Sequence, residues 1–480
     1  MNGCIVNTKY GMVQGVEGKR KSVRVFRGIP FAKPPVGELR FCPPQEPDCW
    51  EGVKLCDSYA PASVQGMRPC ENFEISEDCL YLNVFTAAER PEEKLPVFFW
   101  IHGGAYKMGR TSDSEFDGEA LAQKGAVVVT APYRLGALGF FATAELEEKT
   151  GGSYNLGLLD QQAALRWVQE NIEAFGGDPE RVLVFGQSAG GMSTRMQVVS
   201  PLAHGLFSRA VIHSGGGLNE ADLVRPKEEF QMLCKKCLDL LDWTLRDVMT
   251  RPAEEVVLEL ERAAHTVLEG RELALFQPFV DRCVLHDVPG NSILRGEYAD
   301  IPIICGTVLG DSGMFHRKVR ERVTDDRYRR GFALSPGHAW GKLQIENGRT
   351  PIYTYFMDRK QPPKLNTDKN RYGWETPHSA DISYVFGTLD VRQLAYEEYD
   401  YQLSDAMMDY WLNFAKNGDP NGPGLPYWPK YEKDTPYAMH FGNESFKAEN
   451  LIQTPEEEYV LRYTMEHPGM LCEFHTEELF

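Results

Sequence analysis

A serine flanked by glycines is the residue pattern with the clearest chemistry in this chain. Ser188 lies in GQSAGG at residues 186–191, directly after the apolar run at 182–185. A tight turn from a strand into a helix needs small neighbours around its central residue, and Gly186 and Gly190 supply that space. The hydroxyl would then stand at the N-terminus of the following helix, whose N–H groups favour negative charge. The pattern predicts that Ser188 is a nucleophile for acyl transfer.

A second apolar run, residues 97–101, ends in His102-Gly103-Gly104. Two successive glycines let backbone N–H groups approach a ligand closely, because no Cβ atom stands in the way. We expect the N–H groups of Gly103 and Gly104, with that of Ala189 as a third, to bind the oxyanion that forms when the serine attacks. His102 is expected to pack within its loop and not to act as a base.

The elements that must position these groups alternate between strand and helix. The apolar runs at 97–101, 126–130 and 182–185 have the composition of buried strands. Residues 156–176 repeat apolar side chains every three or four positions, which predicts an amphipathic helix that ends at two glycines. Alternation of this kind favours parallel pairing, so the fold class is α/β with a sheet covered on both faces. Residues 226–270 are expected to be mostly helical and to form a cap.

Composition excludes several classes of protein. The 480 residues carry 51 Lys and Arg against 69 Asp and Glu, a formal net charge of −18. This acidic balance argues against nucleic-acid binding and, more weakly, against anionic membrane surfaces. With 42% apolar and 25% charged residues the chain is globular and not disordered. The longest apolar stretch, residues 125–144, is interrupted too often to span a membrane.

The cysteines and the N-terminus suggest a cytoplasmic protein. The N-terminal sequence lacks the basic start and apolar stretch of a secretory signal. Eleven cysteines are scattered without framework spacing, as expected in a reducing compartment. One CxxC pair, Cys234 and Cys237, lies in a helix-like stretch with no second pair, and we interpret it as two ordinary helix cysteines.

Longer motifs along most of the chain resemble the type-B carboxylesterase and cholinesterase family, and the resemblance favours a bacterial member. Besides GQSAGG and the HGG loop, these are residues 26–32 (FRGIPFA), 34–37 (PPVG), 76–83 (SEDCLYLN), 133–136 (YRLG), 155–161 (NLGLLDQ), 175–179 (FGGDP) and 418–421 (GDPN), with Trp411, Asn413, Phe414 and Ala415.

This resemblance implies an α/β-hydrolase fold: a mostly parallel central sheet with helices on both faces and a helical cap. It implies one domain over residues 1–480, with cap insertions at roughly 220–270 and 312–345. The implied activity is that of a serine carboxylesterase, which hydrolyses small to medium, neutral esters with water through an acyl-enzyme. No metal or cofactor is implied, and a monomer or small homo-oligomer is expected.

The resemblance also implies the partners of the serine. Ten of the eleven histidines follow Ser188, and spacing alone does not choose among them. The segment at 377–386 (PHSADISYVF) is similar to the family segment around the catalytic histidine, which makes His378 the expected base. The family acid is a Glu in G-x-x-x-D-E-G, and residues 306–313 read GTVLGDSG. Counting from either end places Asp311 on the Glu position or just before it.

Only a carboxylate can orient the histidine, so Asp311 is the expected acid, with Asp325 and Asp326 as alternatives. Asp is one methylene shorter than Glu, which requires His378 to lie slightly closer.

The chain departs from the family pattern at several positions. Gln187 replaces the Glu that usually precedes the nucleophile, and the loss of this charge argues against choline esters. Pro132 replaces a usual Asn. Cys79 matches one cysteine of a common disulfide, but Ser63 stands near the place of the expected partner.

Two other functions stay open on the sequence. Acyl transfer to an alcohol other than water would use the same residues. Some relatives are non-catalytic binding proteins of the same fold, but those lack the serine.

Overall fold

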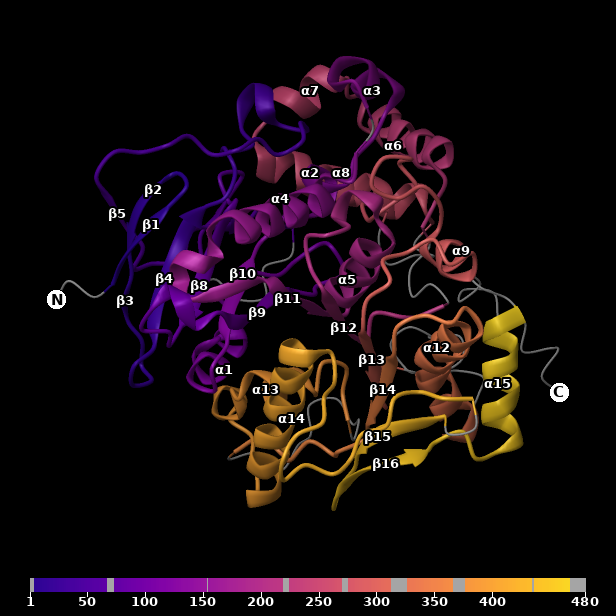
Figure 1. Cartoon of the computed structure of the whole chain (residues 1–480). Coiled ribbons are helices and arrows are strands. Elements are labelled where there is room, and N and C mark those ends of the chain that lie inside the picture. The colour runs from indigo at the N-terminus through magenta and orange to yellow at the C-terminus, as the bar shows by residue number, and fades with distance from the viewer. Residues whose placement is uncertain are drawn as a thin grey trace.

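The computed structural model describes residues 4–66, 73–152, 154–218, 224–269, 275–311, 326–365, 376–433 and 436–466. Its centre is a sheet of eleven strands flanked by helices, which confirms the expected α/β class (Figure 1). In spatial order the strands are β16 (Phe446–Asn450), β15 (Tyr437–Phe441), β14 (Ile352–Met357), β13 (Ile303–Val308), β12 (Arg209–His213), β11 (Gly177–Gln187), β9 (Leu95–Ile101), β10 (Val127–Ala131), β8 (Tyr81–Thr86), β4 (Arg24–Pro30) and β3 (Val16–Glu17).

Strand direction changes only toward the two edges of this sheet. Neighbouring strands pair in parallel throughout the central part of the sheet, which consists of β15, β14, β13, β12, β11, β9 and β10. The outer strands β16, β8, β4 and β3 pair antiparallel with their neighbours. The three apolar runs expected as strands are β9, β10 and β11, and they lie side by side in the parallel part. The carboxyl ends of β9 and β11 therefore meet at one edge, where the HGG loop and the serine turn begin.

Two hydrophobic layers cover the sheet because its strands alternate their side chains. In β9, Val97, Phe99 and Ile101 face one layer, while Phe98 and Trp100 face the other. The first layer contains α4 (Leu156–Asn171), α5 (Ala189–Val199) and α8 (Ala253–Val267). The second contains α1 (Glu119–Gln123), α13 (Ile382–Phe386) and α14 (Glu398–Asn417), on the opposite side of the sheet in Figure 1.

The expected amphipathic helix is α4, followed by a 3₁₀ turn at Ile172–Phe175. Gly176 ends the turn with a φ of 84°, a left-handed conformation that glycine adopts without a Cβ clash. Leu158, Leu165 and Val168 are fully buried, so the apolar stripe on α4 faces the sheet as expected.

The stretch expected as a helical cap contains α6 (Lys227–Leu241), α7 (Leu245–Thr250) and α8. Helix α8 packs against α6 and against α2 (Gly136–Gly139). An ion pair of 2.8 Å between Lys107 and Glu261 fastens α8 to the chain just after the HGG loop.

The cap segments and the single domain stay predictions. Of the second segment, residues 312–325 lie outside the described residues. Its remainder begins α12 (Asp326–Glu346), which packs on β13, β14 and α15 (Pro455–Glu466). The remaining α-helices in the described part of the chain are α3 (Ala144–Thr150) and α9 (Pro289–Leu294).

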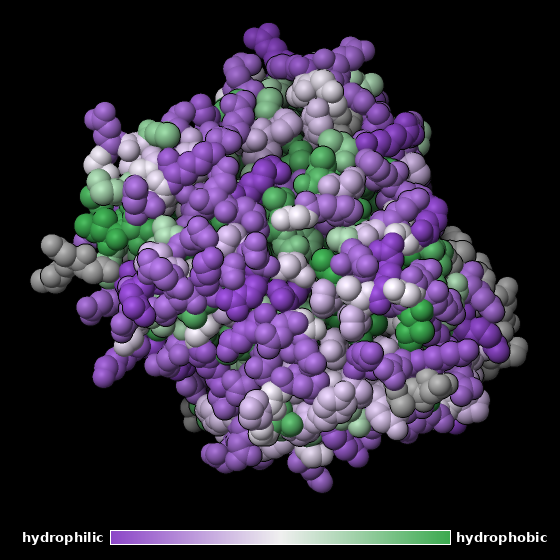
Figure 2. All heavy atoms as spheres, in the orientation of Figure 1, coloured by the Kyte–Doolittle hydropathy of each residue, from purple (hydrophilic) through white to green (hydrophobic). Residues whose placement is uncertain are grey.

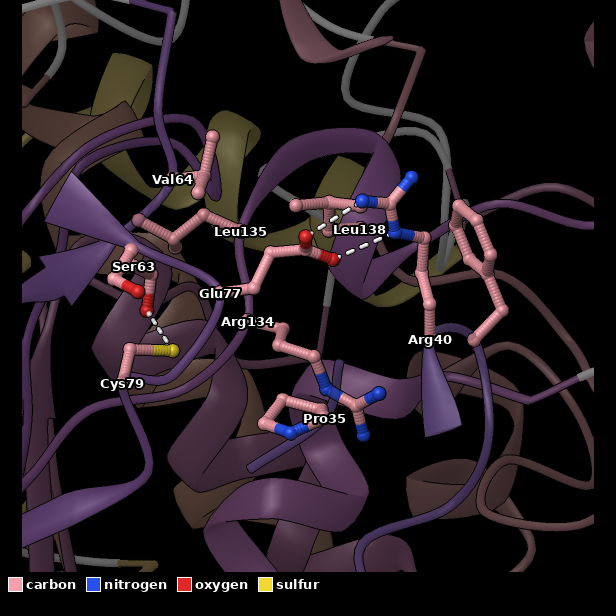
Figure 3. A pocket seen from close by; sticks show the side chains of 11 residues that line it. Pro35, Arg40, Ser63, Val64, Glu77, Cys79, Arg134, Leu135 and Leu138 are labelled. Carbon is pink, nitrogen blue, oxygen red and sulfur yellow. Dashed lines mark hydrogen bonds and ion pairs between the residues drawn. The ribbon is translucent and has the colours of Figure 1, made fainter. Parts of the chain in front are cut away.

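The cysteine pair in α6 has a packing role. Cys234 and Cys237 are both fully buried, and burial raises the pKa of each thiol. All nine cysteines within the described ranges are free thiols. At the position where the family has a disulfide, the Ser63 hydroxyl lies 3.3 Å from the Cys79 sulfur (Figure 3). Ser63 and Cys79 are therefore in contact through a hydrogen bond.

The face shown in Figure 2 is mostly hydrophilic, and one of its apolar clusters lies at the N-terminal end. It lies over the small sheet formed by β1 (Ile5–Thr8), β2 (Gly11–Gln14) and β5 (Val53–Leu55), in which Met12, Val53 and Leu55 are exposed. Within the part of the chain that the structure describes, no helix is long and apolar enough to cross a membrane.

Candidate active site

Ser188 stands at the turn between β11 and α5 in a strained backbone conformation. Its φ is 57° and its ψ is −127°, values that cost a non-glycine residue on the order of 1–3 kcal/mol. The turn is held because the Ser188 N–H donates to the His213 carbonyl at 3.0 Å and its carbonyl accepts from Met192 N–H at 2.8 Å. The residue is buried, with 8% of its surface exposed, at the carboxyl edge of the sheet.

The glycines beside the serine are required by close packing. A Cβ atom on Gly190 would lie 2.0 Å from the Ile101 carbonyl oxygen, and one on Gly186 would lie 2.3 Å from the Gly190 carbonyl oxygen. Both distances are far below any real contact, so the turn can form only with hydrogen at these two positions. The sequence interpretation of the small neighbours is confirmed.

The HGG loop lies directly against the serine turn. A Cβ on Gly103 would lie 3.1 Å from the Ser188 Cβ and 2.6 Å from the Gln187 carbonyl oxygen. Among the described residues, the N–H groups of Gly103, Gly104 and Ala189 donate none of the backbone hydrogen bonds formed outside helices and strands. Gly103 and Ala189 are therefore brought together at the serine turn, and Gly104 follows Gly103 in the loop.

Two side chains fix how this loop points. The Tyr133 hydroxyl donates to the His102 carbonyl at 3.0 Å, and His102 Nδ1 lies 2.8 Å from the Gly103 carbonyl. In a trans peptide the C=O and N–H groups point in opposite directions. Anchoring these two carbonyls therefore turns the N–H groups of Gly103 and Gly104 away from the anchors. Sequence reasoning did not identify Tyr133, although it lies in the YRLG motif.

His102 packs in the loop, as expected. It is buried and stacks on the Tyr133 ring at 4.7 Å between ring centroids. Burial lowers the pKa of His102 to about 4, which keeps the ring neutral and able to donate from Nδ1.

His378 and Asp311 form a hydrogen-bonded pair at the same edge of the sheet. His378 lies in the turn before α13, and its Nδ1 is 2.6 Å from Asp311 Oδ1. The second carboxylate oxygen of Asp311 accepts from Val308 N–H at 3.0 Å, which fixes the carboxylate just after β13. The histidine side chain is 13% exposed and that of Asp311 is 5% exposed, so the pair reaches solvent through the imidazole.

Close backbone approach compensates for the short acid. A Cβ on Gly310 would lie 2.3 Å from the Thr376 carbonyl oxygen and 2.9 Å from the His378 nitrogen. The missing side chain at Gly310 thus lets the two turns touch, and an Asp reaches the ring where the family uses a Glu. Asp325 lies outside the described residues, and only the backbone of Asp326 is described, at the start of α12.

His378 has a second partner that sequence reasoning missed. The side-chain amide nitrogen of Gln187 lies 3.0 Å from His378 Nε2. Gln187 was noticed because it replaces a Glu, but its contact depends on how β11 meets the turn at 376–381. The spacing of residues in the sequence does not predict this contact between two distant segments.

A second His–Asp pair lies beneath the first and was not expected. His213 Nδ1 is 2.9 Å from Asp381 Oδ2, to which the Tyr355 hydroxyl donates at 2.6 Å. The Trp411 indole N–H donates to His213 Nε2 at 3.1 Å. Burial would raise the pKa of Asp381, but hydrogen bonds from His213 and Tyr355 hold it below its usual value. The only sequence signal was the position of Asp381, three residues after His378.

Two cavities lie near these elements. One of about 10 Å³, bordered by Arg40, Glu77 and Leu138 (Figure 3), has room for about one water molecule. The other, of about 390 Å³, is lined by Lys107 and by Leu258, Glu261 and Arg262 of α8, beside the chain that follows the HGG loop. Over the ranges described, no group of three or more His, Cys, Asp or Glu residues could hold a metal ion.

Comparison with protein families identifies the chain. A family model described as the carboxylesterase family matches residues 2–335 and 332–460. The chain belongs to the carboxylesterase family. It is a carboxylic ester hydrolase with the α/β-hydrolase fold, as the sequence motifs implied.

Relatives of this carboxylesterase span nearly its whole length. It is 34% identical to carboxylesterase 1F of Mus musculus, over 93% of this chain and 91% of the mouse protein. It is also 34% identical to para-nitrobenzyl esterase of Bacillus subtilis (strain 168), over 91% of this chain and 94% of that protein. A solved PNB esterase structure superimposes with a TM-score of 0.80 at 32% identity, covering 96% of this chain and 99% of that one.

Proposed function

We propose that this carboxylesterase works as a serine hydrolase in which Ser188, His378 and Asp311 act together through an acyl-enzyme. The observation that carries the proposal is the 2.6 Å contact between His378 Nδ1 and Asp311, at the sheet edge where Ser188 stands on its strained turn. The family name supports ester hydrolysis, and this geometry supports the way it is done.

The first half of the reaction acylates the serine. His378 Nε2 takes the proton of the Ser188 hydroxyl as the oxygen attacks the ester carbonyl. Asp311 accepts from Nδ1–H, holds the ring in the required tautomer and stabilises the imidazolium. His378 then gives the proton to the leaving alcohol, and the acyl group stays on Ser188. Water repeats the cycle and releases the acid.

The N–H groups of Gly103, Gly104 and Ala189 stabilise the charge that develops on the carbonyl oxygen. Donors aimed at such an oxyanion are typically worth about 3 kcal/mol each in the transition state. Support comes from the contact of the HGG loop with the serine turn and from the two anchored carbonyls described above.

The substrates are proposed to be neutral esters of small to medium size. The side chain next to the nucleophile is the neutral amide of Gln187, which contacts His378. A carboxylate in this place would attract a cationic alcohol group, and an amide does not.

The test is hydrolysis of p-nitrophenyl esters of increasing acyl length by wild type and by Ser188→Ala. Wild type should turn over short chains, and the variant should lose about a thousandfold or more in kcat. Ser58→Ala is the matched control, because Ser58 is exposed and lies far from Ser188 in the sequence. This variant should behave like wild type.

Two further readouts sharpen this test. The acyl-enzyme should appear in the intact mass of wild type after rapid quenching, and it should be absent in Ser188→Ala. Equal inertness of wild type and variant across the whole series would contradict the proposed function, as would hydrolysis that survives the loss of Ser188.

A further inference from the structure

Gln187 lies between the oxyanion loop and the catalytic histidine. It is the last residue of β11 and is 6% exposed. Its amide nitrogen is 3.0 Å from His378 Nε2, and its amide oxygen would lie 3.3 Å from a Cβ on Gly103. The side chain thus has its oxygen toward the HGG loop and its nitrogen on the atom that must take the proton of Ser188.

This contact fixes where the proton of the resting imidazole is. An amide nitrogen only donates hydrogen bonds, so His378 Nε2 must be the acceptor and carry no hydrogen. The ring proton is then on Nδ1, where it donates to Asp311 at 2.6 Å. This neutral tautomer is the one a general base needs.

We propose that Gln187 is a positioning residue that keeps Nε2 of His378 unprotonated between turnovers and thereby extends activity toward acid pH. The proposal rests on the proposed function, because it concerns the histidine that takes the proton of Ser188. When that proton arrives, the amide nitrogen and Nε2 are both donors, so the amide must turn to offer Oε1 or move away. A carboxylate at position 187 could only accept, and it would hold a proton on Nε2 before substrate binds.

Other charged and titratable groups also surround His378. Asp311 approaches from the end of β13, and Asp381 lies in the same turn, bound to His213 of β12 and Tyr355 of β14. From the other side, Arg392, paired with Glu115, donates to the Ser379 carbonyl at 2.9 Å. These groups stay the same when residue 187 is changed, so a difference between variants isolates the effect of Gln187.

The experiment measures kcat/KM for p-nitrophenyl acetate between about pH 4.5 and 9 in wild type, Gln187→Glu and Gln187→Met. The acid limb of the profile should move to higher pH by about 1 unit in Gln187→Glu, because a carboxylate contacts Nε2. It should move by about half a unit in Gln187→Met, which loses the hydrogen bond without adding charge. A residue with only a packing role would change kcat/KM at all pH values without moving the limb.

Gln123→Glu is the matched control, since it adds the same charge at an exposed position beside Arg20. Its acid limb should coincide with that of wild type. Acid limbs of Gln187→Glu and Gln187→Met that both coincide with wild type would overturn the inference. If Gln187→Glu does not fold, the Gln187→Met profile decides alone.

A second readout separates this inference from the proposed function. The rate of covalent labelling of Ser188 by a fluorophosphonate also depends on the unprotonated base, and it needs no ester turnover. If wild type is labelled but hydrolyses no ester, the proposed function fails, and the labelling profiles still test Gln187. Labelling rates with the same pH dependence in wild type and both Gln187 variants would overturn the inference.

Discussion

Two His–Asp pairs at the carboxyl edge of the sheet, His378–Asp311 and His213–Asp381, differ in what surrounds the second ring nitrogen. In both pairs Nδ1 contacts a carboxylate, at 2.6 Å for His378 and Asp311 and at 2.9 Å for His213 and Asp381. The Nε2 atom of His213 accepts from Trp411, which is fully buried, and the His213 side chain is itself 0% exposed. The His378 side chain is 13% exposed.

The comparison teaches that the pairing itself does not make a catalytic base. In both rings Nδ1 faces a carboxylate and Nε2 faces a nitrogen donor. A rigid indole holds the Nε2 of His213, whereas a side-chain amide that can turn contacts the Nε2 of His378. His378 is the ring proposed to exchange its partner for Ser188, so chemistry is expected from one pair and stability from the other.

The largest expected effect is that of His378→Ala. It removes the proton acceptor and should lower kcat by about a thousandfold or more, with a small change in melting temperature because the ring reaches the surface. Steady-state kinetics and thermal unfolding measure the two effects. His286→Ala, at an exposed histidine, should leave both unchanged. If His378→Ala kept more than a tenth of the wild-type kcat, the assignment of catalysis to the His378–Asp311 pair would be contradicted.

Asp311→Asn should follow closely, with a loss of kcat on the order of a thousandfold. An amide can donate to Nδ1 and favours the wrong tautomer of His378. Asp311→Glu sharpens the prediction, since the turn at Gly310 already touches residues 376–378 and leaves little room for a longer side chain. We expect it to recover only part of the activity. Full activity of Asp311→Asn would assign the acid to another residue.

Asp381→Asn should instead cost mainly stability. Asn replaces the charged acceptor of the His213 Nδ1–H and of the Tyr355 hydroxyl with a neutral amide. Weakening such buried hydrogen bonds to a charged group costs about 1.5–3 kcal/mol, which urea unfolding measures. Because its folded pKa is lowered, Asp381 stabilises the protein above its unfolded pKa near 4, and this stabilisation is lost as the pH falls through the folded pKa. The difference between wild type and variant should therefore shrink on acidification. A larger effect on kcat than on stability would contradict the assigned roles.

The smallest effect is expected at a third pair site, the half-buried histidine His440. Burial alone would lower its pKa, but hydrogen bonds at 2.9 Å and 2.6 Å to Asp358 and Glu449 raise it. A raised folded pKa means that the stabilisation is complete below the unfolded pKa, near 6.5, and is lost as pH rises through the folded value. His440→Gln should lose about 1 kcal/mol at pH 6 and less at pH 9. A loss that grows with pH would show that the ring is neutral in the folded protein.

The sequence predicts the parts of the site that depend on local pattern. Strands β9 and β11 and the turns after them follow from apolar runs and glycines, so Ser188, Gly103 and Gly104 could be placed before the structure was known. Partners brought together by topology could not be placed in this way. The Gln187–His378 contact joins β11 to a turn 191 residues further along the chain.

Asp311 shows why the remaining parts of the site could not be predicted from the sequence. Its motif allowed two alignments, and Asp is one methylene shorter than the family's Glu. The missing distance is closed by the backbone at Gly310, which no pattern around the acid reveals. His213 and Asp381 were visible only as residues near motifs, because their pairing depends on strands β12 and β14 lying beneath the turn at 376–381.

The measurement that tests the central claim most directly is the rate of fluorophosphonate labelling at neutral pH in wild type, His378→Ala and Asp381→Asn. Peptide mass spectrometry then locates the label. We predict that wild type is labelled on Ser188 alone, that His378→Ala reacts about a thousandfold more slowly, and that folded Asp381→Asn stays within about tenfold of wild type. Labelling of His378→Ala at the wild-type rate, or on a residue other than Ser188, would contradict the account.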